Sequence, residues 1–293
     1  MRLTGVGHLL FALGLAGLGV LSLFSGDFPY SWQPVPPWVP GREILAHLSG
    51  ILLLAGGVGL LIKRTAGPAA SILAFYLLGW VLVLQAPRAA QAPGDMGMWL
   101  GVAESTVLFS GGWILAAILA GPQTRARMPF LTGEGAMLIA RILFGIACLV
   151  LGLSHFVYTA ATASMIPAWI PAHIGFAYFT GACHFATGLG ILSGVFPRLA
   201  ATLEATMISL FVLLLHIPAA LAEPASRLLW TMVFVAAALA GAAWANASSL
   251  KSTAWGWTRW SPQQPKLVVV GPQRQTPRSA QTAPTVRNAS PPL

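Results

Sequence analysis

The chain has 293 residues, of which 56% are apolar and only 8% are charged, and its formal net charge is +9. Soluble proteins carry about a quarter charged residues, so this composition excludes an ordinary soluble domain and predicts a membrane protein. The basic C-terminal segment has no stacking-aromatic motif, so we expect the positive charge to face anionic lipid headgroups and not nucleic acid.

Eight long apolar stretches follow one another along the chain, and we expect each to be a membrane-spanning helix. A helix needs about 20 mostly apolar residues to cross the hydrocarbon core. The expected spans cover residues 6–24, 44–62, 69–84, 98–120, 142–157, 174–195, 205–217 and 228–247. The seventh span is short and must begin near Leu199, so that it encloses Glu204. The predicted fold class is an all-α membrane protein with eight transmembrane helices.

The two halves of the chain repeat each other at a constant offset of 131 residues: VPPWVP at residues 35–40 reappears as IPAWIP at residues 166–171. The same offset carries Gly14 onto Gly145 and Trp99 onto Trp230. We predict two parallel four-helix repeats, residues 1–124 and 125–248. Because each holds an even number of spans, a pseudo-twofold axis along the membrane normal should relate them. Residues 249–293 are rich in Pro, Gln, Ser, Thr and Arg and are predicted to be a disordered basic tail.

The basic residues fall mostly on one side of the membrane if the eight spans alternate. That side receives Arg2, Lys63, Arg64, Arg125, Arg127, Arg198 and the tail after Lys251. The other side receives Arg42, Arg88 and Arg227, offset by Asp27, Glu43, Asp95 and Glu223. The positive-inside rule then predicts both termini in the cytoplasm and a location in the inner (cytoplasmic) membrane.

Each half joins its first two spans through an outer loop that carries Pro-x-Trp-x-Pro. Proline removes backbone donors and stiffens the chain, and Trp favours the headgroup level. The loops are therefore either rigid interfacial caps or lids over a cavity between helices. Their presence in both halves favours the cap.

Three ionisable residues occur inside the spans of the second half only. Arg141, His184 and Glu204 stand where the first half has Leu10, Leu53 and Leu73. Ionisable groups inside a membrane are expensive and mark functional sites by default. At about 1.5 Å per helical residue the three lie within one helical turn of each other in depth. We therefore predict an Arg141–Glu204–His184 cluster inside the second half.

Several roles are open for this cluster. It can be a structural polar clasp, or it can bind a quinone or another small polar-headed redox molecule, with His184 at a carbonyl and Glu204 moving a proton. Haem ligation by His184 and His216 is disfavoured by their different depths. His155, His173 and His216 form a candidate outer trio that can bind metal or simply be solvated. Cys148 and Cys183 are predicted to be small buried apolar residues. No role is assigned to Glu104.

The second half resembles the DoxX-like family of small four-helix membrane proteins. The resemblance rests on RILFG from Arg141, GLSHF from Gly152, IPAWIP, YFTG from Tyr178, GLGIL from Gly188 and PRLAA from Pro197. It covers most of residues 141–220, and the first half more faintly. The family's first-helix arginine matches Arg141, whereas its usual second-helix glutamate corresponds to His184, so that Glu204 would supply the acid from the next helix.

This resemblance implies a role in a membrane-bound redox system, because the family includes a subunit of a thiosulfate:quinone oxidoreductase. The expected function is an accessory subunit of a quinone- or thiol/sulfur-linked redox system, with Arg141, His184, Glu204, His155 and His216 as its cofactor-binding residues. The cofactor is not identified; quinone is the candidate. Partners are the lipid bilayer and proteins of a membrane redox complex. The alternatives are a small-solute transporter or channel, and a structural anchor for a soluble partner.

Overall fold

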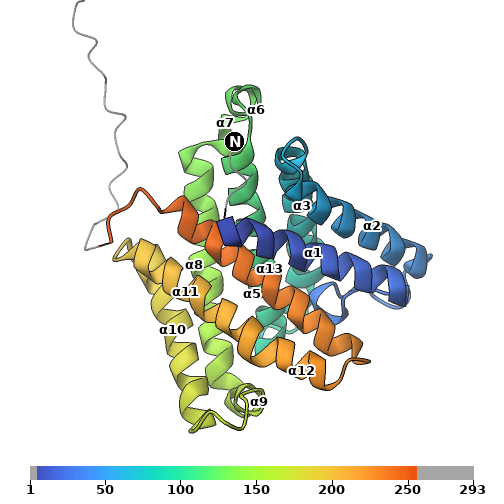
Figure 1. Ribbon diagram of the computed structural model, residues 1–293, viewed down its shortest axis with the longest axis vertical. Helices are drawn as coiled ribbons and strands as arrows, with labels where there is room; N and C mark the ends of the chain where they lie inside the picture. The colour runs from blue at the N-terminus through green and yellow to red at the C-terminus, as the bar shows by residue number, and fades with distance from the viewer. Residues whose placement is uncertain (1–4, 256–293) are drawn as a thin grey trace, which may run out of the picture. The chain divides into compact units, whose positions relative to one another are not determined.

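Within residues 5–255, which the structure describes, every regular element is helical and eight helices are long and apolar enough to span a membrane. Figure 1 shows this computed structural model. The spans are α1 (Gly5–Ser25), α2 (Arg42–Leu61), the joined run α3–η2–α4 (Ala66–Gln91), α5 (Met96–Leu119), α8 (Glu134–Val157), α10 (His173–Ser193), the joined run α11–η3–α12 (Pro197–Ala222) and α13 (Arg227–Ser249). Four short helices lie in the connections: η1 (Tyr30–Trp32), α6 (Pro122–Arg127), α7 (Pro129–Thr132) and α9 (Thr159–Ser164). The predicted all-α fold class is confirmed, and the chain is an integral membrane protein.

The third and seventh spans are longer than their apolar stretches predicted, because each continues past a proline. In the third span a π turn, η2 (Trp80–Gln85), separates α3 (Ala66–Gly79) from α4 (Ala86–Gln91), which contains Pro87. In the seventh, η3 (Val212–His216) separates α11 (Pro197–Phe211) from α12 (Ile217–Ala222), which contains Pro218. Proline lacks the N–H for an i to i−4 bond. A single π turn just before it changes the bonding register and lets the helix continue.

Helices in the two halves have corresponding neighbours. Helix α1 packs on α2 as α8 packs on α10, and α3 packs on α5 as α11 packs on α13. The halves meet where α13 lies beside α1 and α5, and where α5 lies beside α8 (Figure 1). The duplication and its pseudo-twofold axis stay predictions. The described residues belong to one compact unit, and the predicted boundary near residue 124 falls in α6.

Glycines allow α8 and α10 to approach closely. A Cβ atom added to Gly152 would lie 2.7 Å from the carbonyl oxygen of Gly181, and one added to Gly188 would lie 2.7 Å from that of Gly145. Such distances are too short for a real side-chain carbon. Small residues at helix contacts let backbones pack tightly in a membrane, where the hydrophobic effect does not drive helix association.

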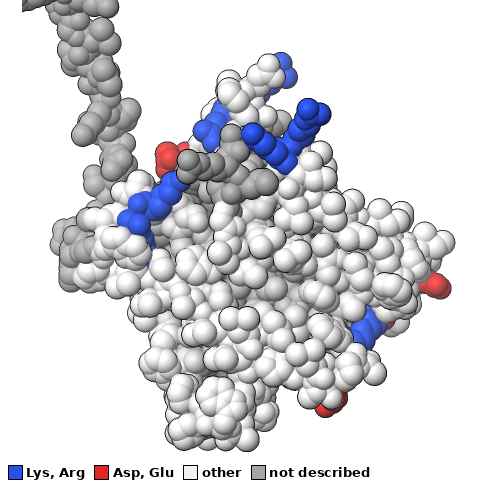
Figure 2. Space-filling model, in the orientation of Figure 1, with Lys and Arg blue, Asp and Glu red and all other residues white. Residues whose placement is uncertain are grey.

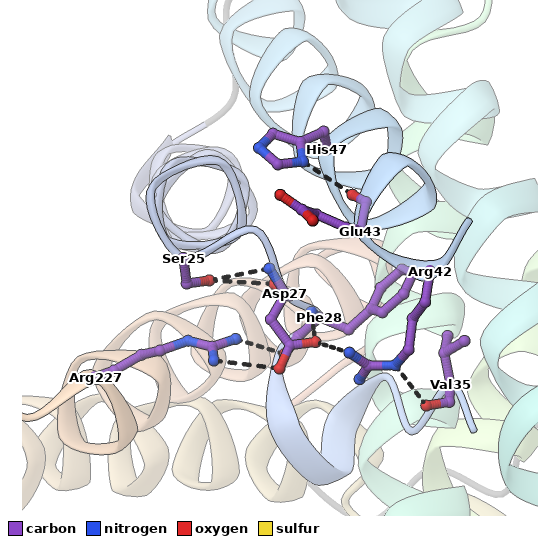
Figure 3. A network of polar contacts seen from close by, with 8 residues as sticks. All are labelled: Ser25, Asp27, Phe28, Val35, Arg42, Glu43, His47 and Arg227. Atoms are coloured by element: carbon purple, nitrogen blue, oxygen red, sulfur yellow. Dashed lines mark hydrogen bonds and ion pairs between the residues drawn. The ribbon is translucent and has the colours of Figure 1, made fainter. Parts of the chain in front are cut away.

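Charged side chains are confined mostly to the two ends of the bundle. In Figure 2 the Lys and Arg side chains gather mainly at the end near α6 and the start of α3, and most of the visible face is uncharged. At the opposite end, the carboxylate of Asp27 accepts from Arg42 and lies 3.5 Å from Arg227 Nη1 (Figure 3). Arg227 also donates to the carbonyl oxygen of Phe28 at 2.7 Å. Asp27 therefore ties the α1–α2 connection to the start of α13.

The predicted disordered tail, residues 249–293, lies outside the described residues from 256 onward. The structure describes residues 249–255 of this segment. Ser249 is the last residue of α13, and the ring centroid of Trp255 lies 3.9 Å from the guanidinium carbon of Arg198.

Candidate functional site

A buried histidine–glutamate pair lies inside the second half. His184 on α10 and Glu204 on α11 are 3% and 1% exposed, and the His184 Nδ1 and Glu204 Oε1 atoms are 2.6 Å apart. The other carboxylate oxygen, Glu204 Oε2, is buried and makes no hydrogen bond within the described part of the chain. Because an isolated carboxylate is expensive in a membrane interior, this pairing makes Glu204 tolerable there. This part of the predicted cluster has the expected geometry.

His155 on α8 stands against the same histidine. Its ring centroid is 4.9 Å from that of His184, and the two rings meet edge to face. The His155 Nδ1 atom lies 3.0 Å from Thr180 Oγ1 of α10, and Phe211 of α11 packs against both imidazoles. His155 therefore belongs with the buried pair and not with an outer histidine trio.

These imidazoles line a largely apolar cavity of about 480 Å³. Its walls come from α8, α9, α10, α11, η3, α13 and the α9–α10 connection of the second half, and from η1 and α5 of the first. Glu204 is not among the lining side chains, whereas His184 is, so His184 connects the buried carboxylate to the cavity. Within the described residues, hydrogen bonds to His184 use Nδ1 and leave Nε2 for a ligand.

Two further ionisable residues reach this cavity from elsewhere in the fold. His216, in the π turn η3, lines it, and so does Glu104 of α5. Glu104 and the neighbouring lining residue Trp32 come from the first half. The sequence assigned no role to Glu104, because nothing in it indicates that this side chain reaches a cavity built mainly by the other half.

Arg141 lies apart from the His184–Glu204 pair, and the predicted three-residue cluster is wrong at this position. Its guanidinium donates from Nε to Ser249 Oγ at 2.8 Å and from Nη2 to the Ser249 carbonyl oxygen at 2.7 Å. No ion pair joins it to Glu204 among the described residues. Depth along a helix fixes the height of a Cα atom, but a long arginine side chain extends toward the membrane surface.

Metal and disulfide chemistry receive no geometric support in residues 5–255. No group of three His, Cys, Asp or Glu side chains there could hold a metal ion, and His173 does not line the cavity. Cys148 and Cys183 are free thiols. The buried Cys148 Sγ lies 3.8 Å from Glu204 Oε1, so it adds a weak donor to the carboxylate.

The second Pro-Trp-Pro loop borders the cavity, because Ile166 and Ile170 line it. Trp38 and Trp169, the tryptophans of the two loops, are 78% and 71% exposed. Exposed tryptophans fit the interfacial cap, and the two isoleucines show that the second loop also closes one side of the cavity.

Sequence reasoning missed a polar ring in the first half. Gln33 Nε2 donates to Tyr76 Oη at 2.8 Å, Tyr76 Oη donates to Ser49 Oγ at 2.6 Å, and Ser49 Oγ donates to Gln33 Oε1 at 3.0 Å. These residues are uncharged, so a search for ionisable residues inside spans does not find them. The ring satisfies its own polar atoms and lines no part of the His184 cavity.

No known protein family, curated protein or solved structure matches this chain. The DoxX-like resemblance stays an expectation based on the motifs of the second half.

Proposed function

We propose that the cavity beside His184 binds the headgroup of a membrane quinone and that the chain acts as a DoxX-like accessory subunit of a membrane redox system. The observation that carries the proposal is the His184–Glu204 pair, in which one imidazole nitrogen bonds a buried carboxylate while the ring lines an apolar cavity.

The cavity and its polar groups fit a quinone. Small-molecule sites usually measure about 300–1,000 Å³ and are apolar with a few polar groups, and this cavity is about 480 Å³. The imidazole of His184 can donate to a carbonyl oxygen through Nε2 when Glu204 holds the proton that the pair shares. Glu204 Oε2, buried without a partner among the described residues, is available to hold a proton.

Each of these residues has a role toward such a headgroup. A bound quinone supplies reversible two-electron, two-proton redox chemistry. His184 would hold a quinone oxygen through Nε2 and pass a proton to or from Glu204 through Nδ1, since imidazole can carry a proton on either nitrogen. His155 stands beside His184, where it would orient the same headgroup, while the apolar walls exclude water.

Sequence motifs support the accessory role, and the distribution of charge supports the membrane location and orientation. The motifs that run from RILFG at Arg141 to PRLAA at Pro197 support a DoxX-like subunit with protein partners in a redox complex. The gathering of Lys and Arg at one end of the bundle supports an inner-membrane protein with both termini in the cytoplasm (Figure 2). Transport is less well supported, because Leu53 and Leu73, at the first-half positions that match His184 and Glu204, are fully buried leucines.

The test is thermal unfolding of the full chain in detergent with a decyl-tailed ubiquinone added in increasing amounts. A ligand that binds only the folded state at about 100 times its dissociation constant raises the melting temperature of a protein of this size by roughly 5–10 °C. We expect a saturable rise for the wild type and for Tyr76→Phe, a first-half control outside the cavity. We expect none for His184→Leu/Glu204→Leu, which removes the pair without leaving a lone charge.

Equal rises in all three proteins would mean that the quinone binds elsewhere or only alters the micelle. No rise in the wild type would make the pair a structural clasp.

A further inference from the structure

A second cavity of about 560 Å³ lies beside Arg141, between α8 and the connection from α10 to α11. Arg141 is only 8% exposed and lines this cavity together with Gly194 and Pro197. The other walls are mostly apolar and include Ile142 and Leu192. The cavity shares no lining residue with the His184 cavity.

The positive charge of Arg141 has no acidic partner among the described residues. Its two hydrogen bonds use Nε and Nη2, so within the described residues Nη1 is left for a ligand. No carboxylate of residues 5–255 makes an ion pair with it. Glu134, seven positions earlier on α8, is exposed and acts on it only through longer-range attraction. A buried cation without a counter-ion is expensive, so a bound anion would stabilise it.

The backbone around the cavity also favours an anion. Helix α11 begins at Pro197 and has no side-chain cap at its first turn. Unbonded N–H groups and the positive end of the helix dipole attract negative charge at such a terminus. The connection before it turns sharply, with Gly194 at φ 72° and Phe196 at φ 49°, and this brings the helix start against the cavity.

We propose that this cavity binds the phosphate headgroup of an anionic phospholipid, with Arg141 Nη1 donating to the phosphate and the apolar walls contacting an acyl chain. The surrounding charge fits this ligand, because basic residues lie in the α2–α3 and α5–α8 connections, at the start of α11 and just after α13: Lys63, Arg64, Arg125, Arg127, Arg198 and Lys251. Basic pockets between transmembrane helices on the cytoplasmic side are suited to anionic headgroups. A lipid explains the apolar walls, which a free phosphate ion would not need.

The test is native mass spectrometry of the full chain in detergent with phosphatidylglycerol or phosphatidylcholine added. We expect phosphatidylglycerol to bind the wild type at least about tenfold more tightly than phosphatidylcholine. Both lipids carry a phosphate, but the quaternary ammonium of phosphatidylcholine cancels its charge and is repelled by Arg141 and the basic residues nearby. Arg141→Gln should weaken phosphatidylglycerol by about tenfold or more. Arg64→Gln, which removes a charge at the same end outside the cavity, should leave it within about twofold.

Arg141→Gln also removes the bonds to Ser249, so a second variant leaves Arg141 in place. Ile142→Trp fills the cavity from α8 and should weaken phosphatidylglycerol by a similar factor. Unchanged binding in both variants, or equal binding of the two lipids, would overturn the proposal. If inorganic phosphate alone displaces the lipid and binds as tightly, the ligand is a soluble anion and the lipid assignment is wrong.

Discussion

Glu204 and Arg141 are both charged groups inside the same membrane bundle, and the fold accommodates them in different ways. Glu204 is fully surrounded by protein and depends on one short contact with His184. Arg141 has a long side chain that reaches the end of α13, where Ser249 supplies two acceptors. The difference follows from side-chain length, since arginine can extend toward the surface while glutamate on an inner helix face cannot.

Removing one member of the buried pair should lower the free energy of unfolding at least as much as removing both, because the remaining member is left unpaired. His184→Leu leaves Glu204 without its main partner and should lower the free energy of unfolding by about 3–5 kcal/mol. His184→Leu/Glu204→Leu should lower it by no more than that, because it leaves no unpaired charge. Chemical denaturation of the wild type, His184→Leu, Glu204→Leu and the double variant checks this. A double variant that loses the sum of both single losses would contradict the pairing.

The interlocked glycines of α8 and α10 fix how closely these helices approach, and that approach brings His155 against His184. Gly188 packs on the backbone of Gly145, and Gly152 packs on that of Gly181. At the level of the element, these contacts position the site more than helix propensity does. Apart from a few polar residues these helices are apolar, so propensity and the hydrophobic effect alone give them no preferred partner.

Gly188→Ala should therefore destabilise the bundle by about 1–3 kcal/mol, because its Cβ would lie 2.7 Å from the Gly145 carbonyl oxygen. Gly79→Ala is the matched control, since its Cβ would meet nothing within 4 Å. Alanine there should be neutral or stabilising by up to about 1 kcal/mol. Thermal unfolding of both variants measures the contrast. Equal stability of the two would show that the α8–α10 contact is looser than described.

The elements that the sequence predicted well are those marked by long apolar runs, and all eight spans occur. The helix ends around Pro87 and Pro218 were predicted less well, because a π turn that carries a helix past a proline leaves no mark in composition. The His184–Glu204 pair was predictable from depth and from the leucines at matching positions. Arg141 and Glu104 were not, because their placement depends on helix rotation and on contacts between the two halves.

At the scale of the whole molecule, Asp27 joins the two halves at one end of the bundle. Burial alone would raise the pKa of Asp27, but hydrogen bonds from the Phe28 N–H and Arg42, with the charges of Arg42 and Arg227, outweigh it and hold the pKa below its ordinary value of 3.8. Figure 3 shows both arginines converging on this carboxylate. The stability it contributes is thus fully present above its ordinary pKa and is lost as the pH falls through the lower folded value.

Wild-type protein should therefore lose more thermal stability than Asp27→Asn when the pH is lowered from 7 to about 2. Glu43→Gln is the control, because this carboxylate belongs to the same region and makes no ion pair within the described residues (Figure 3). It should lose as much as the wild type on acidification. An acid loss in Asp27→Asn equal to that of the wild type would show that the Asp27 contacts do not contribute.

The distribution of charge also predicts the orientation of the whole chain. With most Lys and Arg in connections at one end, we expect both termini in the cytoplasm. A reporter that works only in the cytoplasm, fused after Leu293, should be active, and its counterpart that works only outside should be silent. The reverse pattern would contradict the orientation.

The most direct test of the quinone site is solvent extraction and chromatography of the purified protein. We expect stoichiometric quinone from the wild type and from Tyr76→Phe, and none from His184→Leu/Glu204→Leu. Quinone absent from all three, or retained in the double variant, would contradict a quinone site at the His184–Glu204 pair.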